Sequence, residues 1–501
     1  EWELDPPPPR LHFIVGSLIV AGLVVIVWVT VLAEHRSAEE ETAEVQMEER
    51  ALALALGEER DALCKQNIRL MFAFTLLFYL ACGIAPGGPV FDRFLYYLAS
   101  GAARGPTFVP PDGRNTLVGV SESMHGCCQL LLALPVGMIV DAYPYRRARL
   151  LKVAAAIGCA YAVVGVAAVL TDYMVLMYAA LVLNGIFNNL ADNCTEAIFS
   201  DSMLPGHRSR YFTTLFILKT VGLAIGPLLS AMMCLIIGDR WDPVLMEVIV
   251  CSSILCMPVT CFTLLFFKDP RDPSDSPATS QRTDSWQDES PTSSWSEDRR
   301  FLEANWGPLT RRSVPVLVSV SAFMTSIGEG MTAKFLNLFF IIDMNISPSQ
   351  INWLQTVLAL LTMFLVKGVQ GLARARGRAQ ASLLAFGVSF LCLLTLSCVR
   401  NLTVLVILFL LRGAFHTASG PTDYSIVMDF TASEERGFWY AINSLTAMTF
   451  SGSAFLGGMI SDAYDYRVTF FITAMIYASA GLIYSPLLGL VPREDDGPKD
   501  L

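Results

Sequence analysis

Long apolar runs separated by short polar loops make up most of this chain. Each run approaches the roughly 20 residues that an α-helix needs to cross a bilayer. The pattern predicts an all-α polytopic membrane protein. The expected spans are Ile68–Ala85, Thr116–Val140, Leu150–Leu170, Tyr173–Glu196, Tyr211–Ile237 and Met246–Phe267, then Val314–Ile342, Ile351–Val369, Ala381–Cys398, Leu402–Ser419, Phe438–Ile460 and Val468–Leu490.

One polar stretch, Lys268 to Arg312, separates two groups of six runs. Pro, Ser, Asp, Arg and Thr dominate it, and such a composition buries too little apolar surface to offset chain entropy. We therefore predict a disordered linker over residues 268–312. It would join a bundle at 67–267 to a second bundle at 313–491, which ends in a polar tail at 492–501.

The N-terminal segment, residues 1–33, contains a further apolar run from His12 to Ala33. The apolar region of a cleaved signal peptide is shorter, about 7–15 residues. We expect an extra membrane span, with a removed targeting segment as the alternative. Residues 34–66 are acidic and rich in Ala, Glu and Leu, which fits either a cytoplasmic surface helix or a solvated spacer.

Composition agrees with a membrane protein and excludes several other classes. Hydrophobic residues form 53% of the chain and charged residues only 16%, against about 25% in soluble domains. The net charge of −10 comes largely from the N-terminal segment and the linker, so we expect no nucleic-acid partner. Most cysteines lie in apolar runs without metal-ligand spacing. No phosphate-binding loop or nucleophile–base pair is evident, so we expect neither a cofactor, a metal nor an enzyme.

Basic residues in alternate short loops predict the orientation of the spans. Arginines follow the second, fourth, eighth and tenth spans, and fewer occur in the other loops. Because Lys and Arg accumulate in cytoplasmic loops, these loops and the linker should be cytoplasmic, in a membrane that the sequence does not identify.

Three internal matches suggest that the two halves are structural repeats. Gly137–Arg146 resembles Gly458–Arg467 nearly residue by residue. A second match aligns one set of four residues with another: Gly185, Phe187, Asp201 and Arg208 with Gly413, Phe415, Asp429 and Arg436. A third aligns Asp239 with Asp462. Repeats that enclose a site at mid-bilayer are a transporter architecture.

The chain resembles the major facilitator superfamily from Ile68 to Leu490. The loop after the second span keeps the motif residues Gly137, Asp141, Arg146 and Arg147, although Ala142 and Pro144 depart from the family pattern. The fifth span carries Gly222, Gly226 and Pro227, which look like the family's antiporter motif. Asn184 stands where many drug/proton antiporters carry an arginine. The resemblance implies two six-helix bundles related by pseudo-twofold symmetry, and a pathway lined by spans one, four, seven and ten.

Polar residues within the fourth span form one stripe at a spacing of four. They are Asn184, Asn188, Asp192 and Glu196. An ionisable side chain at the bilayer centre costs about 2.5–3.5 kcal/mol, so each needs water or a partner. The stripe is either the wall of a polar cavity or a set of interhelical hydrogen bonds. Asp192 and Glu196 are candidate coupling carboxylates, and Lys219 is a candidate partner for either.

The tenth and seventh spans carry the matching groups of the second half. Arg412 and His416 share a face of the tenth span, and Arg412 either anchors an anionic substrate or forms a salt bridge, with Asp192 as one partner. Glu329 in the seventh span is a candidate substrate and coupling residue. Lys334 lies nearer the span's end, where we expect it to extend towards the interface.

The second span carries Glu122 and His125 on one stripe, and His titrates near physiological pH. They either take part in coupling or are merely satisfied by neighbours. The motif residues Asp141, Asp201, Arg208, Asp429, Arg436 and Asp462 are candidates for gating. We therefore predict a monomeric secondary transporter of a small organic solute that works by alternating access with proton coupling. An uncoupled facilitator and a non-transporting membrane sensor or scaffold remain the alternatives.

Overall fold

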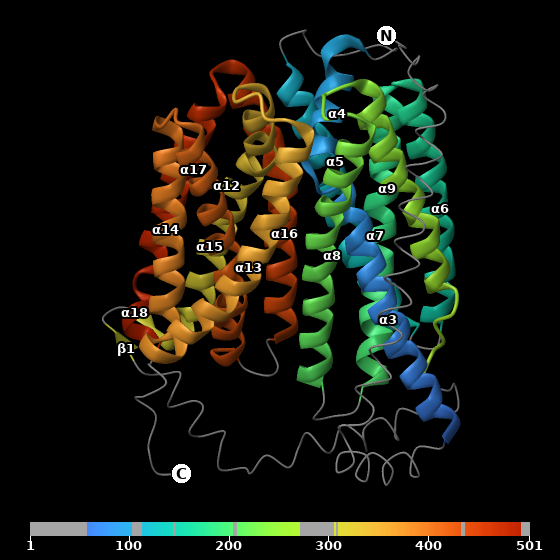
Figure 1. Cartoon of the computed structure of the whole chain (residues 1–501). Coiled ribbons are helices and arrows are strands. Elements are labelled where there is room, and N and C mark those ends of the chain that lie inside the picture. The colour runs from blue at the N-terminus through green and yellow to red at the C-terminus, as the bar shows by residue number, and fades with distance from the viewer. Residues whose placement is uncertain are drawn as a thin grey trace. The chain divides into compact units, whose positions relative to one another are not determined.

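The computed structural model describes residues 58–102, 113–143, 146–203, 208–270, 305–306, 309–431 and 436–491 (Figure 1). The first half contains α3 (Glu58–Ile84), α4 (Pro89–Tyr97), the π-helix η1 (Leu98–Ala102), α5 (Arg114–Ala142), α6 (Arg147–Thr171), α7 (Met174–Ser202), α8 (Arg208–Ile237) and α9 (Pro243–Leu264). The second contains α12 (Val314–Ile342), α13 (Pro348–Arg376), α14 (Arg378–Cys398), α15 (Leu402–Asp429), α16 (Arg436–Ala463), α17 (Tyr466–Tyr484) and α18 (Leu487–Leu490).

Ten helices in this described part of the chain are long and apolar enough to cross a membrane. With α5 and α16 they occupy the places of the spans expected from Ile68 onward. The predicted all-α polytopic membrane fold is confirmed. The apolar run at 12–33 and most of the acidic segment and linker lie outside the described residues.

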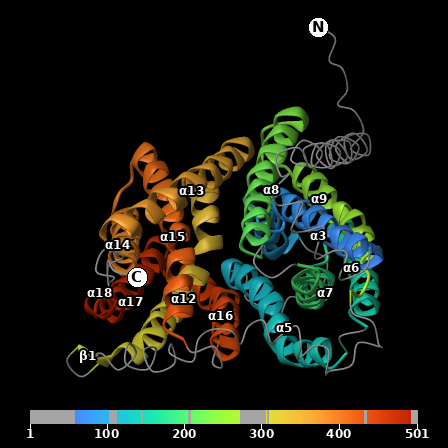
Figure 2. The same ribbon diagram turned by 90° about the horizontal axis from the view of Figure 1, so that it is seen from below.

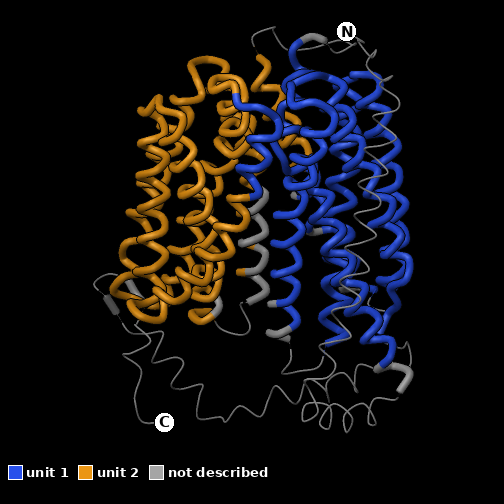
Figure 3. Tube along the Cα trace, viewed as in Figure 1, with its two compact units in different colours: residues 1–108, 128–274, 346–356 blue, residues 109–127, 275–345, 357–501 orange. Residues whose placement is uncertain are grey.

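The helices group into two compact units (Figures 2 and 3). Unit 1 comprises residues 1–108, 128–274 and 346–356, and unit 2 comprises 109–127, 275–345 and 357–501. The units follow the two sequence halves, except that each unit includes one short segment from the other half. The first turns of α5 pack in unit 2, and the first turns of α13 pack in unit 1.

The glycines of the predicted antiporter motif bring α8 against α3 in unit 1. A Cβ atom built on Gly226 would lie 2.5 Å from backbone atoms of Gly83, and one on Gly222 would lie 3.0 Å from the backbone of Leu80. Pro227 contacts the same crossing, 3.1 Å from a Cβ built on Gly83. Small residues allow such close backbone approach between membrane helices. The motif therefore has a packing role here.

Some elements differ from the expected ones. The first helix, α3, begins at Glu58 rather than Ile68, because the Glu58–Lys65 segment favours helix and contains no breaker. Asn67 is buried and donates to Ser202 Oγ at 3.1 Å and to the backbone oxygen of Lys268 at 2.9 Å. Helix α4 was not expected from the pattern. Two short strands, β1 (Asn305–Trp306) and β2 (Leu309–Thr310), and the 3-10 turn η2 (Arg311–Ser313) fall in the stretch expected to be disordered.

Candidate functional site

A cavity of about 470 Å³ lies within unit 2, between α12, α15 and α16, with Phe386 contributed by α14. Binding sites for small molecules have volumes of roughly 300–1,000 Å³. The wall combines aromatic, ionisable and hydroxyl side chains with apolar ones. The aromatic and ionisable members are Phe386, Tyr424, Trp439, Phe450, Glu329, His416 and Asp423.

Glu329 connects this cavity to a buried polar network. Arg412 forms an ion pair with Glu329 and donates to Tyr477 Oη at 3.2 Å, and Tyr477 donates to Glu329 Oε2 at 2.5 Å. His416 Nε2 lies 3.7 Å from the same carboxylate oxygen, and its ring stacks on Tyr477. Arg412 is 4% exposed and does not line the cavity. Of the two roles left open for Arg412, the structure places it in a salt bridge, and its partner is Glu329.

Asp423 is a cavity residue that the sequence analysis missed. It lies on α15 and accepts a hydrogen bond from Tyr484 Oη at 2.6 Å. The signal was present, because residues at i, i+4, i+7 and i+11 share one face of a helix. Extending the stripe of Arg412 and His416 by two further steps reaches Ser419 and Asp423.

Glu122 and Lys334 form a second, mostly buried ion pair in unit 2. Their charged atoms are 3.3 Å apart, and Ser451 donates to Glu122 Oε1 at 3.1 Å. Their side chains are only 19% and 12% exposed. The expectation that Lys334 extends to the interface was wrong, because a buried carboxylate lies within its reach. His125 is close enough to interact electrostatically with both.

The polar stripe of α7 is divided in unit 1. Asn184 and Asn188 are buried within the bundle, whereas Asp192 and Glu196 are exposed. Lys219 on α8 interacts electrostatically with both carboxylates, and its ammonium lies 4.6 Å from the centre of the Tyr79 ring. The first half of the stripe therefore packs inside the bundle, and the second half carries accessible charged groups.

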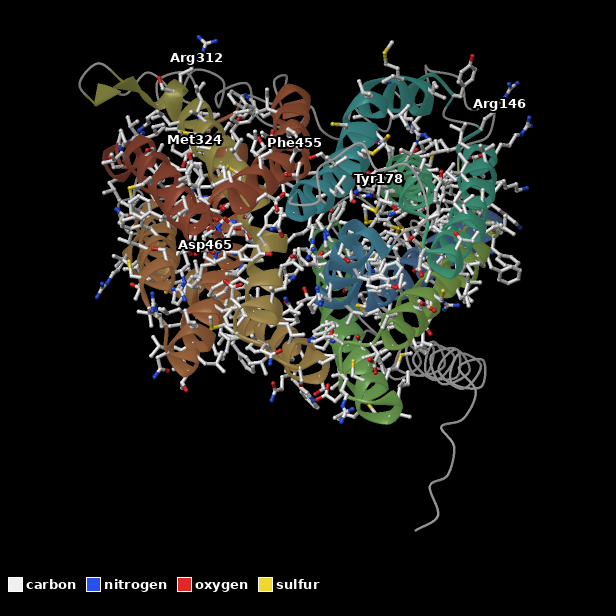
Figure 4. The ribbon with its side chains drawn as sticks, turned by 90° about the horizontal axis from the view of Figure 1, so that it is seen from above. Arg146, Tyr178, Arg312, Met324, Phe455 and Asp465 are labelled. Atoms are coloured by element: carbon white, nitrogen blue, oxygen red, sulfur yellow. The ribbon has the colours of Figure 1, made fainter. Side chains whose placement is uncertain are left out.

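Equivalent ion pairs join consecutive helices in each half. Arg147 pairs with Asp201 at 2.7 Å, linking the start of α6 to the end of α7. Arg378 pairs with Asp429, linking the start of α14 to the end of α15. These positions agree with the register of the second sequence match. Arg146 is exposed and lies just before α6 (Figure 4).

Two aspartates cap the N-termini of helices from the opposite sequence half. Asp462, in the last turn of α16, accepts from the backbone and side chain of Asn115 at 3.0 and 2.9 Å and from those of Thr116 at 2.7 and 2.6 Å, all within unit 2. Asp239, after α8, accepts from the backbone and side chain of Ser349 and from Ser347 Oγ, each at 2.7 Å, within unit 1. Burial alone would raise the pKa of Asp239, but these hydrogen bonds outweigh it and hold the pKa below its ordinary value.

The paired caps agree with the third sequence match and overturn the first. Asp462 contacts the first residues of α5, whereas Asp141, its counterpart in the first match, lies at the last turn of the same helix. Helix α5 has 29 residues and is therefore about 43 Å long, so the two aspartates mark opposite ends of it. The similarity between residues 137–146 and 458–467 is not a structural equivalence.

Several predicted motif side chains are not placed. The backbone of Asp141, Arg208 and Arg436 is helical, and their side chains lie outside the described part. Gly137 is in α5 with no atom within 4 Å of a Cβ built on it. Within the described ranges, no group of three or more His, Cys, Asp or Glu side chains is arranged to hold a metal ion.

The Major Facilitator Superfamily model matches residues 113–318 and 318–501. The chain belongs to the major facilitator superfamily. This membership accounts for the two six-helix halves and the multi-pass membrane fold, and it supports transport of a solute as the general role. No curated protein matches the sequence.

Solved transporter structures share the superfamily fold with this chain at low identity. The nucleoside transporter NupG has a TM-score of 0.57 at 10% identity, over 84% of this chain and 98% of that one. The peptide transporter POT in complex with sulfate has a TM-score of 0.57 at 12% identity, over 85% and 96%. The human organic anion transporter MFSD10 (TETRAN) has a TM-score of 0.52 at 15% identity, over 84% and 99%. These likenesses concern the fold alone.

Proposed function

We propose that this superfamily member is a secondary transporter that moves a small organic solute by alternating access. The observation that carries the proposal is the cavity of about 470 Å³ in unit 2, which presents Glu329, His416 and Asp423 within helices long enough to span a membrane. Ionisable groups at that depth cost free energy, and lining a solute pathway is a common reason for a chain to keep them.

The two aspartate caps supply contacts that can close one access route and break again. Each cap joins an aspartate at the end of one helix, Asp239 or Asp462, to the first turn of a helix from the other sequence half. When such a contact opens, water can hydrogen-bond to the carboxylate and to the freed backbone N–H groups. The contacts can therefore stabilise the closed conformation and still break at a moderate cost in free energy.

We propose the exposed charges of unit 1 as the proton-coupling group. Asp192 and Glu196 lie one helical turn apart, and Lys219 is the cation that interacts with both. One lysine neutralises one of two carboxylates, so this cluster can take up a single proton and approach neutrality. Like charges so close together also favour protonation of one of them.

Uptake by purified protein in proteoliposomes tests transport. A panel of radiolabelled solutes should include a nucleoside, a hexose, a dipeptide, a carboxylate and an aromatic amine, each with and without an imposed pH gradient. We expect saturable uptake of at least one class, increased by the gradient. Saturable uptake that ignores the gradient would indicate a facilitator and refute the coupling. Absence of uptake across the panel, by protein that remains folded, would contradict transport of these solute classes.

The Asp192→Asn variant tests the coupling group. It should keep solute exchange but lose accumulation driven by the gradient, because the proton has no carboxylate to bind at this position. Asp242→Asn is a matched control, since Asp242 is exposed at the N-terminus of α9 and makes no side-chain cap. Full accumulation by Asp192→Asn would exclude this carboxylate and move the assignment to Glu329.

A further inference from the structure

Three of the hydroxyl groups that line the cavity in unit 2 donate to backbone oxygens. Thr325 Oγ1 donates to the backbone oxygen of Ser321 at 3.1 Å, and Ser326 Oγ donates to that of Thr446 at 2.6 Å. Ser419 Oγ donates to the backbone oxygen of His416 at 3.1 Å. A hydroxyl has one donor hydrogen, so Thr325 and Ser326 offer the cavity only acceptor lone pairs, whereas Ser419 also lies within reach of Asp423.

His416 lines the same wall and carries a further acceptor. Its Nε2 lies 3.7 Å from Glu329 Oε2, and we assign the ring proton to Nε2 because the carboxylate attracts it there. Its Nδ1 is buried and has no hydrogen-bond partner among the described residues. A neutral imidazole that carries its proton on Nε2 presents a lone pair at Nδ1.

Asp423 is the carboxylate in this cavity without a protein cation. Its Oδ1 accepts from Tyr484. Within the described ranges no lysine or arginine forms an ion pair with it, because Arg412 pairs with Glu329 and Arg378 with Asp429. A carboxylate at membrane depth is expensive without a compensating charge. Among the residues that the structure describes, no lysine or arginine lines the cavity, so the charge of Asp423 has no compensating cation there.

We propose that this cavity binds an organic ammonium ion, with its N–H groups directed to Asp423 and His416 Nδ1. This inference rests on the proposed transport function and names its substrate class. The four aromatic side chains, Phe386, Tyr424, Trp439 and Phe450, suit the apolar or aromatic body of such an ion, and electron-rich rings also attract cations. An organic anion fits poorly, because Arg412 is buried behind Glu329 and already paired.

Four probes of similar size separate charge from hydrogen-bond donation. They are phenethylammonium, phenyltrimethylammonium, phenethyl alcohol and phenylacetate, with binding measured by calorimetry on the purified full-length protein. We expect phenethylammonium to bind most tightly, because it has both charge and N–H donors. Phenyltrimethylammonium keeps the charge alone and should bind more weakly, and phenylacetate should bind least. Phenylacetate that binds as tightly as phenethylammonium would overturn the proposal.

Variants locate the binding to the named groups. Asp423→Asn should weaken phenethylammonium binding by about 10- to 100-fold, the range for a hydrogen bond to a charged group. Asp343→Asn changes an exposed aspartate just after α12 and should leave phenethylammonium binding unchanged.

His416→Phe, which keeps a ring but removes Nδ1, provides a second variant in case Asp423→Asn does not fold. It should reduce the preference for phenethylammonium over phenyltrimethylammonium. Unchanged affinity in folded Asp423→Asn, or unchanged preference in His416→Phe, would overturn the assignment.

Failure of this inference is distinguishable from failure of the transport proposal. Uptake of another solute class, with no ammonium binding, would refute the substrate class and leave transport standing. Ammonium binding that depends on Asp423, with no uptake into proteoliposomes, would confirm the site and refute transport.

Discussion

Neutralising the cap at Asp462 should open the contact that it makes with the start of α5. The carboxylate accepts four hydrogen bonds, two on each oxygen. Asp462→Asn keeps one acceptor oxygen, and its amide group then faces the donors of Thr116. The variant therefore loses two hydrogen bonds and the attraction of a negative charge to a helix N-terminus.

The size of the effect follows from those losses. A hydrogen bond to a charged group contributes about 1.5–3 kcal/mol, and loss of an N-cap costs about 0.5–2 kcal/mol. Since these values overlap and Asp462 is only half-buried, we expect the contact to weaken by about 2–4 kcal/mol. This corresponds to a roughly 30- to 1,000-fold larger open population. Asp239 accepts fewer bonds and is exposed, so Asp239→Asn should have a smaller effect.

Cysteine labelling can measure this opening. Leu117→Cys on α5 and Ile351→Cys on α13 place reporters just after the capped residues. Both positions are buried, since Leu117 is 9% exposed and Ile351 is 0% exposed. The exposed native cysteines Cys127, Cys159 and Cys398 should first be replaced by serine. A membrane-impermeant maleimide should then label Leu117→Cys faster in the Asp462→Asn background. Asp465→Asn, whose side chain makes no cap, is the matched control.

The double variant of both caps gives the decisive comparison. If the double variant Asp239→Asn/Asp462→Asn labels both reporters at the wild-type rate while it remains folded, the caps do not hold this state. Faster labelling in the Asp465→Asn control by the same factor would show a general loss of stability instead. Thermal unfolding of each variant in detergent separates these outcomes.

Three further predictions concern packing, charge and pH. Gly226→Ala should lower stability by about 1–3 kcal/mol in thermal unfolding, because the new methyl group meets the backbone of α3, whereas Gly368→Ala, with no atom within 4 Å of its Cβ, should be neutral or stabilising. Glu329→Gln or Arg412→Gln alone should cost about 3–5 kcal/mol by leaving one buried charge, and the double variant should unfold at a higher temperature than either. Hydrogen bonds hold the pKa of Asp239 below its ordinary value of 3.8. The carboxylate therefore stabilises the folded protein fully above pH 3.8, and this stabilisation is lost only as the pH falls through the lower pKa of the folded state. The labelling rate of the α13 reporter, divided by that of a free thiol at the same pH, should therefore be equal at about pH 5 and about pH 7. A higher normalised rate at about pH 5 would contradict the low pKa.

The helical membrane fold and the positions of most spans follow from the amino-acid sequence alone. Each span is a local property, because every stretch of roughly 20 residues must lower its own transfer free energy into lipid. The rarity of charge at membrane depth made Glu329, Arg412 and Asp192 visible as candidates without any knowledge of their neighbours. Local helix propensity also explains why α3 continues back to Glu58, although the apolar pattern alone placed its start later.

Which of these groups contact one another depends on how the helices pack in three dimensions. Arg412 and Glu329 are 83 residues apart, and Asp462 and Asn115 are 347 residues apart, so no local pattern specifies either contact. The first sequence match aligned Asp141 with Asp462, although Asp141 lies at the end of α5 and Asp462 contacts its start. Similar residues suit the ends of many helices, so their similarity does not show on which side of the membrane a helix end lies. Asp423 shares the helix face of Arg412 and His416, but only the fold places it beside an aromatic cavity with its charge uncompensated, since compensation depends on side chains brought together from distant helices.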